Sequence, residues 1–366
     1  MNRPAPQIRL AKTDVGAAEL DAISAVLESG VLTNGPATVR FESAFAARHQ
    51  TSHAVAFANG TVALSAIYLG LGIKPGDEVI VPSMTFISSA TSVSHIGATP
   101  VFADVVPDIM TLDPESVAQR LTNRTRAILA VHYGGQAADM DELGAIAADA
   151  GVHLIEDAAQ AHGGSYRGRP VGGLGVAGMF SFTPTKNITT GEGGMVTTNN
   201  GDLAARLKLL RNHGQSALYE HTSLGYNWRL TEMQAAMGIV QLSKLDGILQ
   251  RKRENASSFG SRLTEIPGVS PPVVRDDRDH TYMLYSTQIE QGRDAVLSEL
   301  TRQGIEARLY FPPVHQQPVY ADLGVSLPVT EHLASRLLSL PFHAQLTPAE
   351  FDTILGAVRD AVSTGR

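Results

Sequence analysis

The stretch AVAFANGTVALSAIYLGLGI, residues 54–73, decides the fold. It contains no charged residue and is long enough to raise the question of a membrane span. Asn59-Gly60-Thr61 interrupts it, however, with residue types that favour turns and helix starts. The stretch therefore predicts a short buried strand followed by a buried helix, as found inside α/β proteins.

The same alternation continues towards the C-terminus. Short apolar runs are followed by helical patterns: DEVIVPS (77–83) by TFISSATSVSHIG (85–97), and RAILAVHY (126–133) by MDELGAIAADAG (140–151), before a further run, VHLIEDA (152–158). Two more strand-like runs, GMFSFT (178–183) and GGMVTT (193–198), precede a helix from about 202 to 211 and a longer one from about 231 towards 252. This order predicts an α/β fold with a parallel sheet covered by helices on both faces.

The length of 366 residues, at roughly 150 per domain, indicates two domains. PPVVRDDRDH (271–280) combines Pro with a mixed charge run, which is typical of a solvated loop. The later runs, TYMLYSTQIE (281–290), a helix near 293–303, IEARLYF (305–311) and two terminal helices, are enough for a smaller α+β domain. We expect a large domain over 1–245 and a small C-terminal domain over 246–366.

Composition and charge exclude several classes of function. Hydrophobic residues make up 43% and charged residues 18%, as in an ordinary globular protein. Lys and Arg number 29 against 36 Asp and Glu, and this net charge of −7 argues against nucleic acid or an anionic membrane as a partner. The sequence has no Cys for a thiolate nucleophile or a Cys-ligated metal, and no metal is expected. MNRPAPQIRLAK at the start lacks the apolar region of a signal peptide, so a cytoplasmic protein is expected.

Lysine is scarce, and one of the six lysines differs from the rest in its surroundings. Five stand in turns or on helices beside polar or charged residues, where a lysine is normally solvated: Lys12, Lys74, Lys208, Lys244 and Lys252. Lys186 instead follows the apolar run MFSF and lies in TPTKNITTGEGG (183–194), a segment of small and hydroxylic residues that suits a pocket wall. An amine withdrawn from water has a lowered pKa and can form a Schiff base.

Two further features complement this lysine. Asp157 closes the apolar run VHLIED (152–157), at the strand end where open α/β sheets bind ligands. Asn59-Gly60-Thr61 stands between a strand and a helix, where Thr61 can cap the helix and the free N–H groups can bind a phosphate. A Schiff-base lysine, a carboxylate for a pyridine nitrogen and a phosphate site together predict pyridoxal phosphate as cofactor.

Seven segments then carry a resemblance to a known family: NGTVAL (59–64), PSMTF (82–86), EDAAQAHG (156–163), FSFTPTKNITTGEGGM (180–195), RNHG (211–214), LGYNWRLTEMQAA (224–236) and YFPPVHQQPVY (310–320). In this order, over nearly the whole chain, they resemble the DegT/DnrJ/EryC1/StrS sugar aminotransferases. The resemblance implies the aspartate-aminotransferase-like fold (fold type I), with a mostly parallel seven-stranded sheet in the large domain. It also implies a homodimer with shared active sites, and amino transfer, usually from L-glutamate, to the keto group of a nucleotide-linked sugar.

The resemblance assigns roles position by position. Lys186 matches the lysine that binds the cofactor aldehyde, and Asp157 matches the partner of the pyridinium nitrogen. The other matched cofactor residues are Gln160 against the ring and its phenolic oxygen, Gly60, Thr61 and Ser181 at the phosphate, Phe86 stacked on the ring, and Asn227 reaching the phosphate from the other subunit. A dehydratase branch of the family carries His at the lysine position, so the lysine here favours transamination.

The sequence indicates less about the substrate than about the cofactor. The candidates are His162, Tyr310 and His315 for lining the acceptor pocket and Arg229 for meeting a carboxylate or diphosphate. TKNITTGEGGM (185–195) is closer to members that act at the C4 keto position of hexoses, so C4 is favoured over C3. Two alternatives stay open: amination of a keto-cyclitol of the inosose type with the same fold and residues, and a non-catalytic regulator that binds cofactor or sugar.

Overall fold

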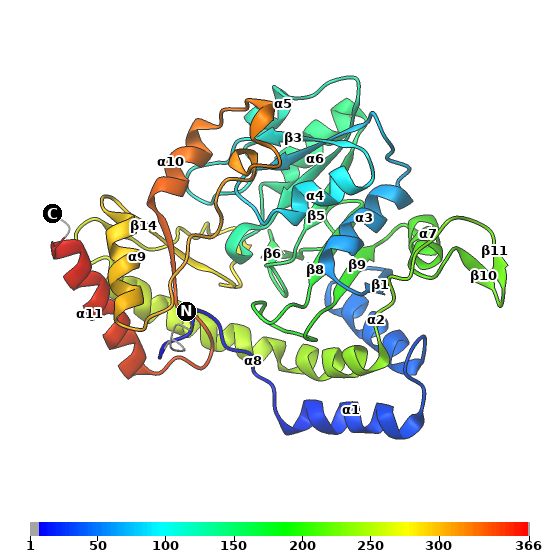
Figure 1. The fold of residues 1–366 in the computed structure, drawn as a ribbon, viewed down its shortest axis with the longest axis horizontal. Coiled ribbons are helices and arrows are strands. Elements are labelled where there is room, and N and C mark those ends of the chain that lie inside the picture. Colours follow the sequence, from blue (N-terminus) through cyan, green and yellow to red (C-terminus); the bar gives the residue numbers. More distant parts are fainter. Residues whose placement is uncertain (1–6, 365–366) are drawn as a thin grey trace.

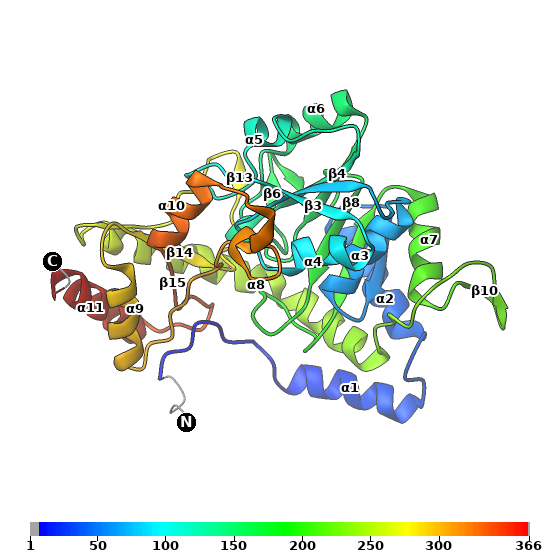
Figure 2. The ribbon, with the colours of Figure 1, turned by 45° about the horizontal axis from the view of Figure 1, so that its top comes forward.

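The computed structural model describes residues 7–364. Figure 1 shows a large domain built on a twisted sheet, and a smaller region beside the far end of α8 (Glu232–Leu263). Two helices of the smaller region, α9 (Arg293–Arg302) and α11 (Pro348–Thr364), lie at one end of the molecule. A hairpin of β10 (Gln215–Ala217) and β11 (Glu220–His221) projects from the opposite end (Figures 1 and 2).

The central sheet has seven strands in the order β1-β9-β8-β5-β4-β2-β3. Neighbours pair in parallel except at β9, which is antiparallel to both β1 and β8. The strands are β1 (His53–Phe57), β2 (Glu78–Pro82), β3 (Thr99–Ala103), β4 (Thr125–Val131), β5 (His153–Asp157), β8 (Ala177–Ser181) and β9 (Gly194–Thr198). The predicted α/β fold with a mostly parallel seven-stranded sheet is confirmed.

The stretch that decides the fold forms β1 and α3 (Gly60–Gly70), as expected. Asn59 caps the helix, because its Oδ1 accepts the N–H of Val62 at 3.0 Å. The expectation that Thr61 is the cap is therefore wrong, since the helix begins before it. No helix in the described part of the chain is long and apolar enough to cross a membrane.

Helices cover both faces of the sheet, because successive residues of a strand point to opposite faces. In β4, Ala127, Leu129 and Val131 pack on the face covered by α3, α4 (Ser88–His95) and α7 (Gly201–Arg211). Ile128 and Ala130 pack on the other face, which is covered by α2 (Pro36–Arg48), α5 (Pro114–Ala118), α6 (Met140–Ala150) and α8. Outside this second layer, α1 (Ala17–Ser29) lies along α8 (Figure 1).

The smaller region contains an antiparallel sheet of β12 (Val269–Ser270), β14 (Tyr285–Ile289) and β15 (Leu337–Leu340), packed against α9 and α11. A helix, α10 (Pro328–Arg336), and two 3-10 turns, Val314–Gln316 and Ala321–Leu323, complete it. The run IEARLYF forms isolated bridges only, at Ile305 and Arg308. The predicted division at 245/246 falls inside α8, which continues unbroken to Leu263, beyond the end expected near 252.

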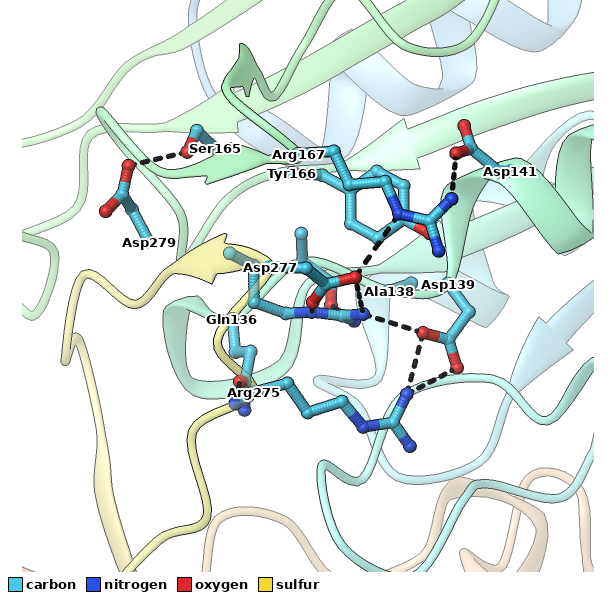
Figure 3. A network of polar contacts seen from close by, with 12 residues as sticks. Gln136, Ala138, Asp139, Asp141, Ser165, Tyr166, Arg167, Arg275, Asp277 and Asp279 are labelled. Atoms are coloured by element: carbon cyan, nitrogen blue, oxygen red, sulfur yellow. Dashed lines mark hydrogen bonds and ion pairs between the residues drawn. The ribbon is translucent and has the colours of Figure 1, made fainter.

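A polar network fastens the 271–280 segment to the large domain (Figure 3). Three short strands meet here: β6 (Ser165–Tyr166), β7 (Arg169–Pro170) and β13 (Arg278–Asp279). The buried guanidinium of Arg278 donates to Asp139 at 3.0 Å and to Asp277 at 2.6 Å, and Arg275 donates to Asp139 at 2.8 Å. The prediction of a solvated loop is therefore wrong for this part of the segment, whose arginines pair with Asp139 just before α6.

Candidate active site

A cavity of about 780 Å³ lies at the carboxyl ends of the parallel strands. Its walls come from the segments that follow β1, β2, β5 and β8, and from residues 308–311 of the smaller region. Parallel strands place their carboxyl ends at one edge of a sheet, so these distant segments converge. The predicted residues that line this cavity are Gly60, Thr61, Phe86, Asp157, Gln160, Ser181, Lys186 and Tyr310.

Lys186 lies in the loop after β8, where its N–H donates to the carbonyl of Thr183 at 3.0 Å. Its half-buried side chain lines the cavity. Burial lowers the pKa of its amine to about 8, and the nearby Asp157 carboxylate opposes this shift in part. The neutral, nucleophilic amine is therefore available at lower pH than in a solvated lysine.

Asp157 is the last residue of β5, and two donors hold its carboxylate. Ser89 Oγ donates to Oδ2 at 2.8 Å, and the N–H of Ala159 donates to Oδ1 at 3.1 Å. Burial raises the pKa of Asp157, whereas these hydrogen bonds and the charge of Lys186 lower it. Because a serine hydroxyl has one proton, Thr85 is the donor in its 2.8 Å contact with Ser89 Oγ. A chain of two hydroxyl groups thus supports the negative charge of Asp157.

The N-terminus of α3 and the end of β8 form a cradle for an anion. Gly60 gives the cradle its room, since a Cβ there would lie 3.0 Å from Ser181 Cβ and 3.1 Å from Met179 Sδ. The first N–H groups of a helix have no acceptor within the helix and attract negative charge. Together with the hydroxyl groups of Thr61 and Ser181 on the cavity wall, they suit a phosphate group.

The side chain of Gln160 is held by a hydrogen bond, whereas the ring of Phe86 is exposed in the cavity. Gln160 is buried, and its Oε1 accepts the N–H of Gly134 at 2.8 Å, within the 3-10 turn Tyr133–Gly135. This bond fixes the amide and leaves its NH₂ group as a donor. Phe86 is 53% exposed, and its ring centroid lies 5.9 Å from that of Phe311 on the same cavity wall. An aromatic ring exposed in a cavity suits stacking against a planar ligand.

Among the four residues predicted for the substrate, Tyr310 lies at the cavity, whereas the prediction for His162 is wrong. The ring of His162 is fully buried, with its centroid 5.5 Å from that of Phe180 and 5.6 Å from that of Phe182. Burial holds its pKa well below the usual value. The turn that directs Gln160 to the cavity thus directs His162 into the core.

The prediction that His315 lines the acceptor pocket is also wrong. Its buried ring lies between two polar partners, with Nδ1 2.6 Å from Ser83 Oγ and Nε2 3.2 Å from Glu331 Oε1. Its own N–H also donates to Ser83 Oγ, at 3.0 Å. His315 therefore fastens the 3-10 turn Val314–Gln316 to the residue after β2.

Asn227 and Arg229 are not among the described residues that line the cavity of their own chain. They lie in the segment that returns from the β10–β11 hairpin, where Asn227 is exposed. Arg229 Nη1 donates to Asn212 Oδ1 at 2.8 Å, and the backbone of Asn227 forms an isolated bridge with Asn212. The roles predicted for both residues require a second subunit and stay predictions.

Sequence reasoning missed several residues of the site, among them Ser89, Arg308 and Phe311. Ser89 is fully buried and reaches the site through its hydrogen bond to Asp157, and no pattern in the sequence signalled this contact. Arg308 and Phe311 flank Tyr310 and line the cavity with it. The exposed Arg308 side chain pairs with Glu306 at 2.6 Å, so a cation stands at the wall formed by the smaller region.

This set of donors fits pyridoxal phosphate. The cradle at α3 suits its phosphate, the buried carboxylate of Asp157 suits a protonated pyridine nitrogen, and the lowered pKa of Lys186 suits a bond to its aldehyde. Within residues 7–364, no three His, Cys, Asp or Glu side chains gather in a group that could hold a metal ion. The sheet and the site together define a pyridoxal-phosphate-dependent transferase.

The chain belongs to the DegT/DnrJ/EryC1/StrS aminotransferase family, whose model matches residues 13–359, and it is a pyridoxal-phosphate-dependent transaminase. It is 44% identical over 349 residues to the dTDP-3-amino-3,4,6-trideoxy-alpha-D-glucose transaminase of Streptomyces venezuelae, covering 94% of this chain and 92% of the relative. It is 39% identical over 362 residues to the GDP-perosamine synthase of Caulobacter vibrioides, covering 96% of this chain and 98% of the relative. The crystal structure of S. venezuelae DesV matches with a TM-score of 0.92 at 42% identity, covering 98% of this chain and 99% of that one.

Proposed function

We propose that this transaminase transfers the amino group of L-glutamate to the keto group of a nucleotide-linked deoxy-keto-sugar. The observation that carries the proposal is the convergence of Lys186, Asp157 and the start of α3 in one cavity of about 780 Å³. The names of the S. venezuelae and C. vibrioides relatives, which each contain a nucleotide-linked amino sugar, support this substrate class.

The residues of the cavity have separate tasks in this reaction. Bound pyridoxal phosphate supplies the electron sink that allows the Cα–H bond of an amino donor to break. With the cofactor bound, Lys186 would take the Cα proton as a general base and release it again as a general acid. Asp157 would keep the proton on the pyridine nitrogen, and the NH₂ group of Gln160 would donate to the phenolic oxygen. The phosphate is held by Gly60, Thr61 and Ser181, and Phe86 stacks on the ring.

We further propose a homodimer in which Asn227 of one chain completes the phosphate site of the other. Its exposure outside the cavity of its own chain supports this role. The neighbouring hairpin supports it too, because Leu218, Tyr219 and Leu224 are exposed by 81%, 86% and 91%. Large apolar side chains gathered on one projection mark an interaction surface. In such a dimer Arg229 approaches the same site and can meet a carboxylate or diphosphate.

The proposal is tested by measuring 2-oxoglutarate released from glutamate with a panel of acceptors. We expect release with nucleotide-linked deoxy-keto-sugars, with a C4 keto sugar preferred over a C3 keto sugar. The name of the S. venezuelae relative, which contains a 3-amino group, is the reason to include both. Release with a keto-cyclitol alone would replace the proposal by the cyclitol alternative. Binding of cofactor and sugar without release would indicate a regulator.

A further inference from the structure

Lys252 on α8 is a second lysine withdrawn from water, and the sequence prediction of a solvated side chain is wrong for it. The residue is 6% exposed, and burial lowers the pKa of its amine to about 7. Its Nζ donates to Asn187 Oδ1 at 2.7 Å and to the carbonyl of Tyr282 at 2.9 Å. Both acceptors are neutral, so the amine is held by dipoles of two other segments rather than by a carboxylate.

The first of these segments contains Lys186. Asn187 directly follows it and is buried, and both ends of its amide are used. While Oδ1 accepts from Lys252, Nδ2 donates to the carbonyl of Thr281 at 3.0 Å. A buried amide with both ends engaged has one favourable orientation, because any rotation leaves polar groups unpaired. The peptide that follows Lys186 is therefore fixed in place.

The second segment leads to Gln160 on the cavity wall. Thr281 is fully buried, and its Oγ1 donates to the carbonyl of Gln160 at 2.9 Å. Its N–H donates to the carbonyl of Gly135 at 2.9 Å, beside the Gly134 N–H that holds the Gln160 side chain. Tyr282, with a φ of 47°, has the left-handed conformation that is uncommon for such a residue. Lys252 binds the carbonyl of this turn, and so joins the Lys186 loop to the Gln160 loop.

We propose that Lys252 is a positioning residue for the transamination: by holding Asn187 and the carbonyl of Tyr282, it fixes the distance between the Lys186 loop and Gln160. This rests on the proposed function, in which Lys186 moves the proton. Proton transfer needs heavy atoms within about 2.6–3.2 Å, and a misplacement of about 1 Å costs up to about 10²-fold in rate. Loss of Lys252 should therefore slow the proton transfer and spare the binding of phosphate and donor.

The test uses the holoenzyme of Lys252→Met, a substitution that keeps an unbranched side chain one atom shorter than lysine and removes its donors. Excess glutamate converts the absorbance of the bound cofactor, and we expect the limiting rate of this half-reaction to fall by about 10-fold or more. The glutamate KM and the cofactor Kd should stay within about 3-fold of wild type, a split that general destabilisation does not produce. The visible circular dichroism of the bound cofactor should change, because it reports how Lys186 holds the ring.

Asn187→Leu tests the route of the effect. Both substitutions break the hydrogen bond between Lys252 and Asn187, so the loss of rate in the double variant should be smaller than the product of the two single losses. Lys244→Met is the matched control, since Lys244 lies on the same helix but pairs with Glu19 at 2.6 Å; it should keep the wild-type rate. If Lys252→Met does not fold, Asn187→Leu alone is expected to slow the half-reaction. Lys252→Arg, which keeps the donors, should retain more activity than Lys252→Met or Asn187→Leu.

Wild-type rates in folded Lys252→Met, or losses that multiply in the double variant, would overturn this inference. A parallel loss of rate and cofactor affinity with a lowered Tm would overturn it too, because a structural role alone explains that result. Borohydride reduction and peptide mapping of the wild type distinguish a failure of the positioning role of Lys252 from a failure of the proposed function. A label at Lys186 with an unimpaired Lys252→Met variant removes only the positioning role, whereas a label at Lys252 removes both.

Discussion

At the scale of single residues, the amine of Lys186 sets the pH range in which the apoenzyme takes up its cofactor. An amine attacks an aldehyde in its neutral form, and burial lowers the pKa of Lys186 from 10.5 to about 8. The rate of cofactor uptake should therefore rise with pH and level off above about 8. The absorbance change after mixing measures this rate at each pH. A free alkylamine, measured in the same way, accounts for titration of the cofactor itself. A rate that still climbs near pH 10 would contradict the lowered pKa.

Asp157→Asn removes the charge that keeps a proton on the pyridine nitrogen and nearly preserves the shape of the side chain. We expect turnover to fall by about 10²-fold or more, because such electrostatic support acts mainly on the transition state. The apparent affinity for glutamate should change little, since Asp157 is assigned to the pyridine nitrogen and not to the amino donor. Steady-state kinetics measure both quantities, and near-normal turnover would show that another group holds the proton.

Ser89→Ala removes one of the two donors to Asp157 and raises the pKa of that carboxyl further. A hydrogen bond to a charged group is worth about 1.5–3 kcal/mol, so turnover should fall by about 10-fold or more, but less than in Asp157→Asn. Ser94→Ala on the same helix is the control, because its hydroxyl contacts Tyr320 at 2.9 Å instead. Equal activity of the Ser89 and Ser94 variants would remove Ser89 from the support of Asp157.

The residues that sequence reasoning found and those it missed differ in one physical respect. Asp157 ends β5 and Lys186 lies in the loop that follows β8, and the carboxyl end of a parallel strand already places such residues at the ligand edge. The surroundings of Lys252 and His162 depend on the direction in which a helix face or a turn points. Packing between segments far apart in the sequence decides this direction. Charged neighbours in the sequence therefore made Lys252 look solvated, although its spatial neighbours bury it.

At the scale of elements, the start of α3 couples stability to cofactor binding. Asn59→Ala removes the acceptor for the Val62 N–H and should lower the free energy of unfolding by about 1 kcal/mol. It should also weaken cofactor affinity, since the loosened first turn faces the phosphate cradle. Asn200→Ala is a matched control, because Asn200 caps α7 through the N–H of Leu203 at 3.0 Å, and Asn200 does not line the cavity. Thermal unfolding should show a similar destabilisation of both variants. Cofactor titration should show a loss of affinity in Asn59→Ala only.

The strands and helices were largely predictable from local pattern, and the exceptions have physical causes. Most sheet strands appeared as apolar runs because both of their faces are buried. β3 has an exposed Thr99 and a Pro at position 100, and no strand was predicted there. The antiparallel direction of β9 depends on pairing with β1 and β8, which no local pattern reports. The end of α8 was placed too early, because the charged run QRKREN (250–255) hides the buried residues Ala256, Phe259 and Leu263 that continue the packed face of the helix.

At the scale of the whole molecule, the shared site of the proposed dimer allows two defective chains to restore one another. If Lys186 and Asn227 of one site come from different chains, a hybrid of Lys186→Ala and Asn227→Ala subunits has one site with both lesions and one with neither. Asn227→Ala leaves a phosphate of about −1.5 to −2 charge short of a donor worth about 1.5–3 kcal/mol, so that parent should be impaired at limiting cofactor. Mixing the parents under conditions that exchange subunits should raise activity above both.

Mass spectrometry of the mixture provides the control, since it shows how much hybrid has formed. Mixing each parent with itself under the same conditions corrects for changes caused by the treatment. Confirmed hybrid without recovered activity would mean that both residues belong to one chain, and the placement of residues 224–236 beside the neighbouring site would then be wrong.

A helix of 32 residues that passes from one domain into the other leaves little room for a hinge. Hinges are a few residues that absorb large changes in φ and ψ, whereas every interior residue of α8 is held in the repeating bonds of the helix. The ion pairs of Arg275 and Arg278 with Asp139 tie the same two parts together at a second point. We therefore expect the wall formed by Arg308 and Tyr310 to keep its place when substrates enter and leave, rather than to close over them. A cavity whose walls do not move leaves the exclusion of water from the reacting atoms to the bound substrate itself.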